Sequence, residues 1–186
     1  MMKSFNKTYI YIGSAILALI IIISCVLILA FKPTSITYTT LIATDGSFCV
    51  DFPTNISYVT NNQENNEFVI DLYSSEEEMF FYATKISKIR EIDFASVVYK
   101  DKENYLKDKE NIQEDSGIVP FPLSNHTAYE YHFVYTDSSY GKDFYCNVLW
   151  VETEHNLYIL NLEVVNENIE KFEEIFGRIK NSFVEL

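Results

Sequence analysis

Glycine and proline are scarce in this chain of 186 residues, which has five of the first and four of the second. Collagen-like and low-complexity disordered proteins need far more of both, so these two classes are excluded. The few glycines stand apart from one another, and the chain has no glycine-rich phosphate-binding motif and no nucleophile-elbow motif. The sequence therefore lacks the short motifs that most directly identify a nucleotide-binding protein or a hydrolase.

Basic residues are few as well. Fourteen Lys and Arg stand against 27 Asp and Glu, which gives a net charge of −13. A nucleic-acid-binding protein needs a basic surface to neutralise phosphates, so we expect no nucleic-acid partner. The three cysteines form no C-x-x-C pair, and no two of the three histidines have the i, i+4 spacing of a helical metal pair. The sequence therefore contains no zinc-site pattern.

One long stretch of the chain has no charge at all. It runs for 23 residues from Tyr9 to Phe31. As a helix it would rise about 34 Å, enough to cross a hydrocarbon core of about 30 Å. Two lysines and the α-amino group precede the run, and one lysine follows it closely. We therefore expect a transmembrane signal anchor over residues 9–31, with residues 1–8 in the cytoplasm and the rest of the chain outside.

Two alternatives remain for this run. A cleaved signal peptide usually has a shorter apolar stretch that ends at a small-residue site, whereas this run ends in the sequence LAFK at residues 29–32. Lipidation at Cys25 is the other alternative, because residues 22–25 (IISC) are similar to a degenerate bacterial lipobox. All three interpretations place the remainder of the chain outside the cytoplasm.

The segment after the apolar run divides into a tether and a domain. Residues 32–44 carry little charge and are rich in Thr and Ser, which predicts a tether. Residues 45–186 are numerous enough to bury a core of their own, and we expect them to form one extracytoplasmic domain. Period-two alternation predicts strands over residues 47–52, 55–60, 67–73 and 79–86, and residues 117–123 read as an edge strand or loop.

Helices and a meander complete the predicted domain. Asp93 is typical of an N-cap, and a helix is expected from there to about Asp108. Residues 126–136, 143–152 and 156–164 predict three strands joined by connections short enough for antiparallel hairpins. A last helix is expected from Asn166, with one apolar stripe made by Ile169, Phe172, Ile175, Phe176, Ile179 and Phe183. These patterns predict the α+β class, with helices packed on an antiparallel sheet.

The order of these elements resembles the order found in a known family. The strand that ends in Asp51-Phe52-Pro53, the central helix, the three-strand meander and the ending Ile-x-x-Ser-Phe at residues 179–183 are similar to the PsbP-like group. This group comprises the extrinsic photosystem II subunit and its bacterial relatives. The resemblance covers roughly residues 45–186 and implies an αβα sandwich with a binding or accessory role.

One group of polar residues is a candidate site. Glu130 and His132 project from the same face of a predicted strand, and Asn147 and Glu163 on the next two strands could share that face if the registers allow. A carboxylate beside an imidazole could bind a divalent cation or perform acid–base chemistry. The alternative is an ordinary polar sheet face. We expect no other cofactor.

Cysteines and aromatic residues raise two further questions. Cys49 and Cys146 both lie in predicted strands outside the membrane, where a disulfide could persist; two buried free thiols are the alternative. Tyr129, Tyr131 and the other aromatic residues of the meander could stack on a ligand, but cross-strand aromatic residues more often stabilise a sheet beneath a helix. We therefore interpret the aromatic residues as core.

Three functional hypotheses follow. The first is a non-catalytic binding or accessory module that is held on the outer face of a membrane by residues 9–31 and has an envelope protein or a peptide as its partner. The second is an enzyme, such as a metal-assisted hydrolase, that uses the Glu130 and His132 face. The third is a subunit of a membrane protein complex in which the span itself makes contacts, as small residues near Gly13 would permit.

Overall fold

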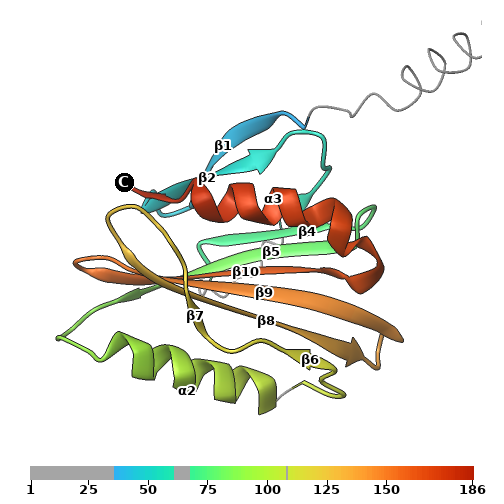
Figure 1. The fold of residues 1–186 in the computed structure, drawn as a ribbon. Coiled ribbons are helices and arrows are strands. Elements are labelled where there is room, and N and C mark those ends of the chain that lie inside the picture. Colours follow the sequence, from blue (N-terminus) through green and yellow to red (C-terminus); the bar gives the residue numbers. More distant parts are fainter. Residues whose placement is uncertain (1–35, 61–67, 108) are drawn as a thin grey trace, which may run out of the picture. The chain divides into compact units, whose positions relative to one another are not determined.

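A large antiparallel sheet is the centre of the fold. The computed structural model describes residues 36–60, 68–107 and 109–186, which are drawn in colour in Figure 1. Within these residues the sheet has eight strands, in the order β3-β4-β5-β10-β9-β8-β6, with β7 also paired to β8. Their bounds are Val59–Thr60 (β3), Ile70–Ser74 (β4), Met79–Ser87 (β5), Glu114–Asp115 (β6), Val119–Pro120 (β7), Thr127–Asp137 (β8), Lys142–Glu152 (β9) and Asn156–Val165 (β10).

The three longest neighbouring strands form the predicted meander. β8 pairs with β9 from Thr127 opposite Glu152 to Asp137 opposite Lys142, and β10 then pairs with β9 on its other side. The short connections leave no room for a crossover helix, so each pair is antiparallel. β10 also pairs with β5, which joins the meander to the strands that precede it in the chain.

Helix α2, Phe94–Lys107, covers one face of this sheet. Asp93 caps it as predicted, with its carboxylate accepting a hydrogen bond from the backbone N–H of Ser96 at 3.3 Å. Phe94 and Val98 are buried against the sheet. Beneath the helix lies an apolar cluster that includes Tyr131, Phe133, Tyr135, Phe144, Val148 and Trp150. The aromatic row of the meander is therefore core, as the sequence analysis proposed.

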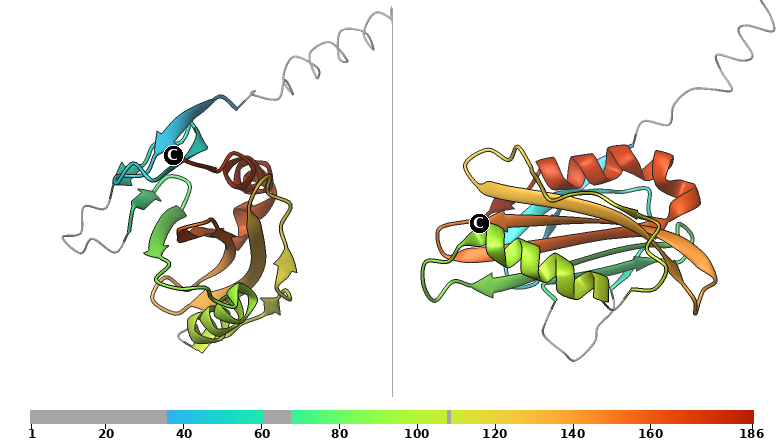
Figure 2. Two further views of the ribbon diagram at one scale, coloured as in Figure 1. Left: turned by 90° about the vertical axis from the view of Figure 1, so that its left-hand side faces the viewer. Right: turned by 60° about the horizontal axis from the view of Figure 1, so that its bottom comes forward.

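Helix α3 and a small sheet share the layer on the opposite face, as the two views of Figure 2 show. The small sheet has the order β1-β2-β11, with bounds Tyr38–Ile42, Phe48–Pro53 and Val184–Glu185. A short 3₁₀ helix, Asn166–Asn168 (η1), leads into α3, Ile169–Asn181. The predicted stripe is buried from Phe172 onward, with Phe172 and Ile179 fully enclosed, and Ile169 at the start of α3 is partly exposed. The layers are thus helix, sheet, and helix with small sheet, which confirms the α+β class.

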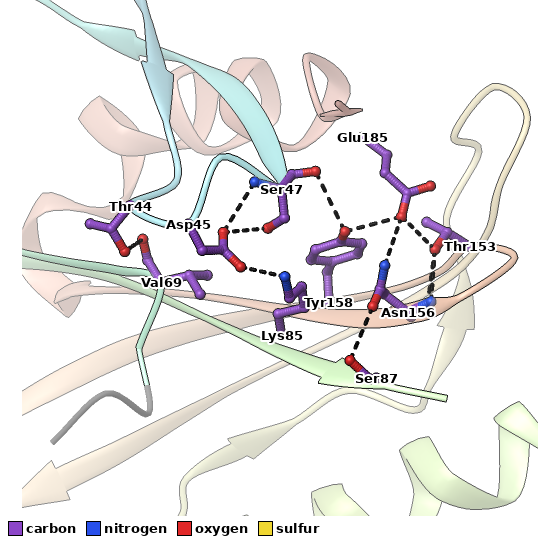
Figure 3. A network of polar contacts seen from close by, with 10 residues as sticks. All are labelled: Thr44, Asp45, Ser47, Val69, Lys85, Ser87, Thr153, Asn156, Tyr158 and Glu185. Carbon is purple, nitrogen blue, oxygen red and sulfur yellow. Dashed lines mark hydrogen bonds and ion pairs between the residues drawn. The ribbon is translucent and has the colours of Figure 1, made fainter. Parts of the chain in front are cut away.

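A polar network joins the C-terminal strand to the main sheet (Figure 3). The carboxylate of Glu185 accepts hydrogen bonds from Thr153 Oγ1 at 2.8 Å, Tyr158 Oη at 3.0 Å and Asn156 Nδ2 at 3.2 Å. These donors lie on or beside β10, whereas Glu185 belongs to the small sheet. The network therefore connects the two sheets at the end of the chain.

Several boundaries differ from those expected. Residues 38–42, expected within the tether, form β1 and pair with β2, and the folded unit begins at Thr37. The strand expected over 55–60 is only Val59–Thr60, and the one expected from residue 67 is paired from Ile70. The predicted span over 9–31 lies outside the described residues. Among the residues that are described, no helix is both long and apolar enough to cross a membrane.

Candidate functional site

The four residues of the predicted site lie on two faces of the sheet. His132 is directly opposite Asn147, so these two side chains share a face with Glu130. Glu163, however, is opposite Cys146, and Cys146 is opposite Phe133, which places Glu163 on the face covered by α2. The sequence allowed Glu163 to share the face of Glu130 and His132 only if the registers permitted it, and the observed registers exclude it. A shift of one residue in register moves a strand's side chains to the opposite face of the sheet. The observed register places Glu163 on the face covered by α2.

Of the three residues that do share a face, Glu130 is held by the layer above it. Glu130 Oε2 accepts a hydrogen bond from Nζ of Lys180 on α3 at 2.6 Å, and Lys180 is itself buried. The His132 ring lies 5.5 Å from that of Tyr145, measured between centroids. The buried Oδ1 atom of Asn147 has no hydrogen-bond partner among the described residues. Glu130 is thus engaged in an ion pair that ties α3 to β8.

No group of three His, Cys, Asp or Glu residues converges on a point within the part of the chain that the structure describes. Divalent cations and zinc need several such ligands at short distances. The described residues therefore offer no preformed metal centre on the Glu130 and His132 face.

The two cysteines of the folded domain are not joined. Cys49 and Cys146 are both free, so the possible disulfide is not formed and the alternative of two free thiols holds, with Cys49 only partly buried. Cys146 points from β9 toward α2, whereas Cys49 lies on β2 of the small sheet, which packs on the opposite face through Phe48 and Phe52. The main sheet separates the two thiols, so they cannot reach the short Cα separation that a disulfide requires.

The most concentrated chemistry in the described residues surrounds Glu163. This residue is only 6% exposed, yet its carboxylate accepts hydrogen bonds from three tyrosine hydroxyls. The donors are Tyr105 on α2 at 2.6 Å, Tyr82 on β5 at 3.0 Å and Tyr135 on β8 at 3.1 Å. The thiol of Cys146 lies 3.6 Å from the same carboxylate. A buried carboxylate is stable only when donors satisfy its oxygens, and these hydroxyls supply them.

Burial and the carboxylate together keep these donors protonated. Burial, followed by the charge of Glu163, raises the pKa of the Tyr82 and Tyr135 hydroxyls far above their ordinary value. Burial likewise raises the pKa of the Cys146 thiol well above its usual value. The hydroxyls therefore stay protonated and available as donors, and the buried thiol is held in its less reactive protonated form.

A lysine closes the cluster on its solvent side. Nζ of Lys109, just beyond the end of α2, lies 3.9 Å from Glu163 Oε1 and 4.0 Å from the centre of the Tyr135 ring. Beside it opens a groove of about 230 Å³, lined by Lys109, Glu110, Tyr135 and residues 136–139. We call Glu163, Tyr82, Tyr105, Tyr135 and Lys109 the Glu163 cluster.

The sequence analysis did not find this cluster as a site. Its members come from three strands and the end of a helix, and no short motif connects them. One signal was present: Glu163 is a carboxylate in a strand whose neighbouring positions are mostly apolar, on the face away from Tyr158 and Leu160. That position predicts a buried acid with partners, but only the pairing of strands identifies them.

Comparisons with known proteins concern the fold. No family model matches the chain, and no curated protein is similar to it in sequence. The structure is similar to LpqN of Mycobacterium tuberculosis, a protein involved in cell envelope biogenesis, with 14% identity and a TM-score of 0.59 over 82% of this chain and 92% of LpqN. It is also similar to the cyanobacterial PsbP of Synechocystis sp. PCC 6803, with 9% identity and a TM-score of 0.58 over 83% of this chain and 96% of that one.

A third similar structure is a protein of unknown function from Pseudomonas aeruginosa, with 13% identity and a TM-score of 0.52 over 79% of this chain and 96% of that chain. These likenesses show that the chain has the PsbP-like fold, which confirms the resemblance noted in the sequence. At such identities they describe the fold alone.

Proposed function

We propose that this chain is an extracytoplasmic binding or accessory module, held on a membrane by its N-terminal apolar segment, and that it binds a partner rather than converting a substrate. The observation that carries the proposal is the uncharged run of residues 9–31 directly before a domain with the PsbP-like fold. The similar fold of LpqN, a protein involved in cell envelope biogenesis, supports the same location.

The short connection between the run and the domain adds to this proposal. Because the folded unit begins at Thr37, only residues 32–36 remain as a linker. Five extended residues span at most about 18 Å. An anchored domain would therefore stay close to the membrane surface, where its partner would be another envelope component.

The state of the acid–base groups supports a role without catalysis. Glu130 is paired with Lys180, and Glu163 is surrounded by hydroxyl donors. Both carboxylates already have partners that hold structural layers together, so neither is free to act as a general base. Hydrolysis that disappears in a His132→Ala variant would overturn this part of the proposal.

Anchoring and topology are tested on the full chain in bacterial cells. The variant Ile20→Lys places a charge at the middle of the run, which costs about 2.5–3.5 kcal/mol for insertion, and Ile20→Leu is its matched control. We expect the parent chain and Ile20→Leu to remain in carbonate-washed membranes, and Ile20→Lys to be retained less well. The domain of the retained chains should be digested by protease added outside spheroplasts. A domain that is protected until the cells are lysed would contradict the proposal.

The mode of attachment is resolved by a second variant. Cys25→Ser removes the only thiol of the run and leaves its hydropathy nearly unchanged. If residues 9–31 form a signal anchor, this variant stays in the membrane and the intact mass is that of the full chain. Release of Cys25→Ser, or a mature mass that begins after the run, would replace the anchor with lipidation or cleavage.

A further inference from the structure

We propose that Glu163, Tyr105 and Tyr135 form a cage for an ammonium group, that Lys109 occupies this cage, and that a small ammonium ligand takes its place when Lys109 moves out. The inference names a ligand class for the binding module proposed above and relies on that proposal only for its biological setting. Its test is independent of anchoring.

The position of Lys109 defines the cage. Its Nζ atom lies 4.0 Å from the centre of the Tyr135 ring, 5.1 Å from the centre of the Tyr105 ring and 3.9 Å from Glu163 Oε1. Two electron-rich rings and a carboxylate around one cation are the arrangement by which proteins recognise ammonium ligands. Glu163 is buried, so its charge is weakly screened by solvent and attracts the cation more strongly than a surface carboxylate would.

The cage does not depend on Lys109 for its shape. Without the lysine, both oxygens of Glu163 still accept hydrogen bonds from tyrosine hydroxyls, at Oε1 from Tyr82 and Tyr105 and at Oε2 from Tyr135. These donors are neutral hydroxyls, so they satisfy the carboxylate oxygens without supplying a compensating positive charge. Removal of Lys109 therefore leaves a formed cage with an unmatched charge.

The adjoining groove provides space for the rest of a ligand. Its volume of about 230 Å³ suits a small molecule rather than a folded partner. Lys109 and Tyr135 belong to its lining, so the groove adjoins the cage. Its lining adds Glu110, Asp137 and the hydroxyl groups of Thr136, Ser138 and Ser139. These groups favour a cation with polar substituents and disfavour an anion.

Lys109 is placed to act as a movable occupant. It follows the last residue of α2 closely, and its backbone N–H donates to the carbonyl of Leu106 at 3.2 Å. Its side chain is one-fifth exposed, so it can leave the cage without opening the core. A ligand must displace it, which lowers the apparent affinity of the parent protein relative to a variant that lacks the lysine.

The first test uses Lys109→Ala in the purified full chain, with tetramethylammonium as the probe and thermal unfolding as the readout. A ligand that binds only the folded state raises the melting temperature in a saturable way. Lys107→Ala is the matched control, because Lys107 is exposed and contacts only Asn104 through its ammonium group among the described residues. Neopentyl alcohol, an uncharged molecule with a similar branched hydrocarbon core, and sodium chloride at equal ionic strength control for apolar and screening effects.

We expect Lys109→Ala to bind tetramethylammonium about tenfold or more tightly than the parent protein and Lys107→Ala, and to show no matching response to neopentyl alcohol. Equal shifts in all three proteins, or an equal effect of the alcohol, would overturn the proposal.

A second measurement uses the parent protein, so it does not depend on the folding of any variant. Acetylation of each lysine by an N-hydroxysuccinimide ester is measured by peptide mass spectrometry with and without tetramethylammonium, which cannot itself be acylated. We expect the probe to increase the acetylation rate of Lys109 several-fold and to leave that of Lys107 unchanged. An unchanged acetylation rate at Lys109 would refute displacement. The protease experiment tests the location of the domain separately, so the two proposals can fail independently.

Discussion

The hydroxyl of Tyr105 on α2 donates a hydrogen bond to Oε1 of Glu163 on β10 at 2.6 Å. The two residues are 58 positions apart in the sequence, and their contact joins the helix to the interior of the sheet. The pair lies among apolar residues, so the bond is formed away from bulk water. It helps to explain how a charged group can be buried between the helix and the sheet.

Removal of this hydroxyl should destabilise the domain. In Tyr105→Phe, Glu163 loses its shortest hydrogen bond while the ring remains in place. Hydrogen bonds to charged groups contribute about 1.5–3 kcal/mol, so we expect the free energy of unfolding to fall by about that amount. Urea denaturation measures it. Tyr99→Phe on the exposed side of the same helix is the control and should change little; equal losses in both variants would contradict this role of Tyr105.

The C-terminal network predicts a pH dependence of stability. Burial raises the pKa of Glu185, but hydrogen bonds from Thr153, Asn156 and Tyr158 together outweigh it and hold the pKa below its ordinary value of 4.5. A depressed pKa in the folded state stabilises the protein above pH 4.5, and this contribution is lost as the pH falls through the folded value. We therefore expect Glu185→Gln to lower the melting temperature at neutral pH and to approach the parent protein in acid.

The control for this pH series is Glu154→Gln. Glu154 is well exposed and contacts only the neighbouring His155 among the described residues. The melting temperature of Glu154→Gln should stay close to that of the parent protein at every pH. The melting temperature of Glu185→Gln could instead differ from that of the parent protein by a constant amount from neutral pH to pH 3. That result would show that the charge of the Glu185 carboxylate does not stabilise the network.

The thiols of Cys49 and Cys146 should differ in reactivity. Cys146 is fully buried, and burial raises its pKa well above the usual value, whereas Cys49 is partly exposed. Iodoacetamide reacts with the thiolate, so we expect Cys49 to be alkylated first and Cys146 only after unfolding. Peptide mass spectrometry without reduction measures the alkylation of both cysteines. A peptide pair linked through Cys49 and Cys146 would contradict the fold described above.

The ion pair between Glu130 and Lys180 should couple β8 to α3. A double-mutant cycle with Glu130→Gln and Lys180→Met isolates their interaction, for which we expect about 1–2 kcal/mol because the lysine is buried. The exposed pair of Lys142 and Glu78 is the control and should show a smaller coupling. A coupling no larger than that of the control pair would show that Glu130 is not chiefly a structural partner of Lys180.

Much of the fold was predictable because each element has its pattern within its own segment. The stripe of α3 from Ile169 to Phe183 and the alternation of the meander appear in consecutive residues, as does the cap at Asp93. The boundary at β1 was missed because Tyr38–Ile42 is a short strand, uncharged and rich in Thr, that pairs at an edge, and such a segment reads equally well as a linker.

The candidate site was predictable only in part. Glu130, His132 and Asn147 do share a face, but Glu163 lies on the other face and has partners on β5, β8 and α2. The sequence alternation shows that Glu163 points away from Leu160, yet it does not show which face of β9 that direction matches. The length and geometry of the hairpin connection set that relation.

The sequence by itself determined the net acidity, the apolar run, the types of most elements and the order that resembles the PsbP-like fold. These properties depend on neighbouring residues, whose periodicity and composition are visible without any tertiary contact. Only the tertiary structure decided that Cys49 and Cys146 lie on opposite sides of a sheet and that three tyrosines and Lys109 gather around Glu163. Those relations depend on strand register and on which layer covers which face, and both are fixed by the packing of segments that are distant along the chain.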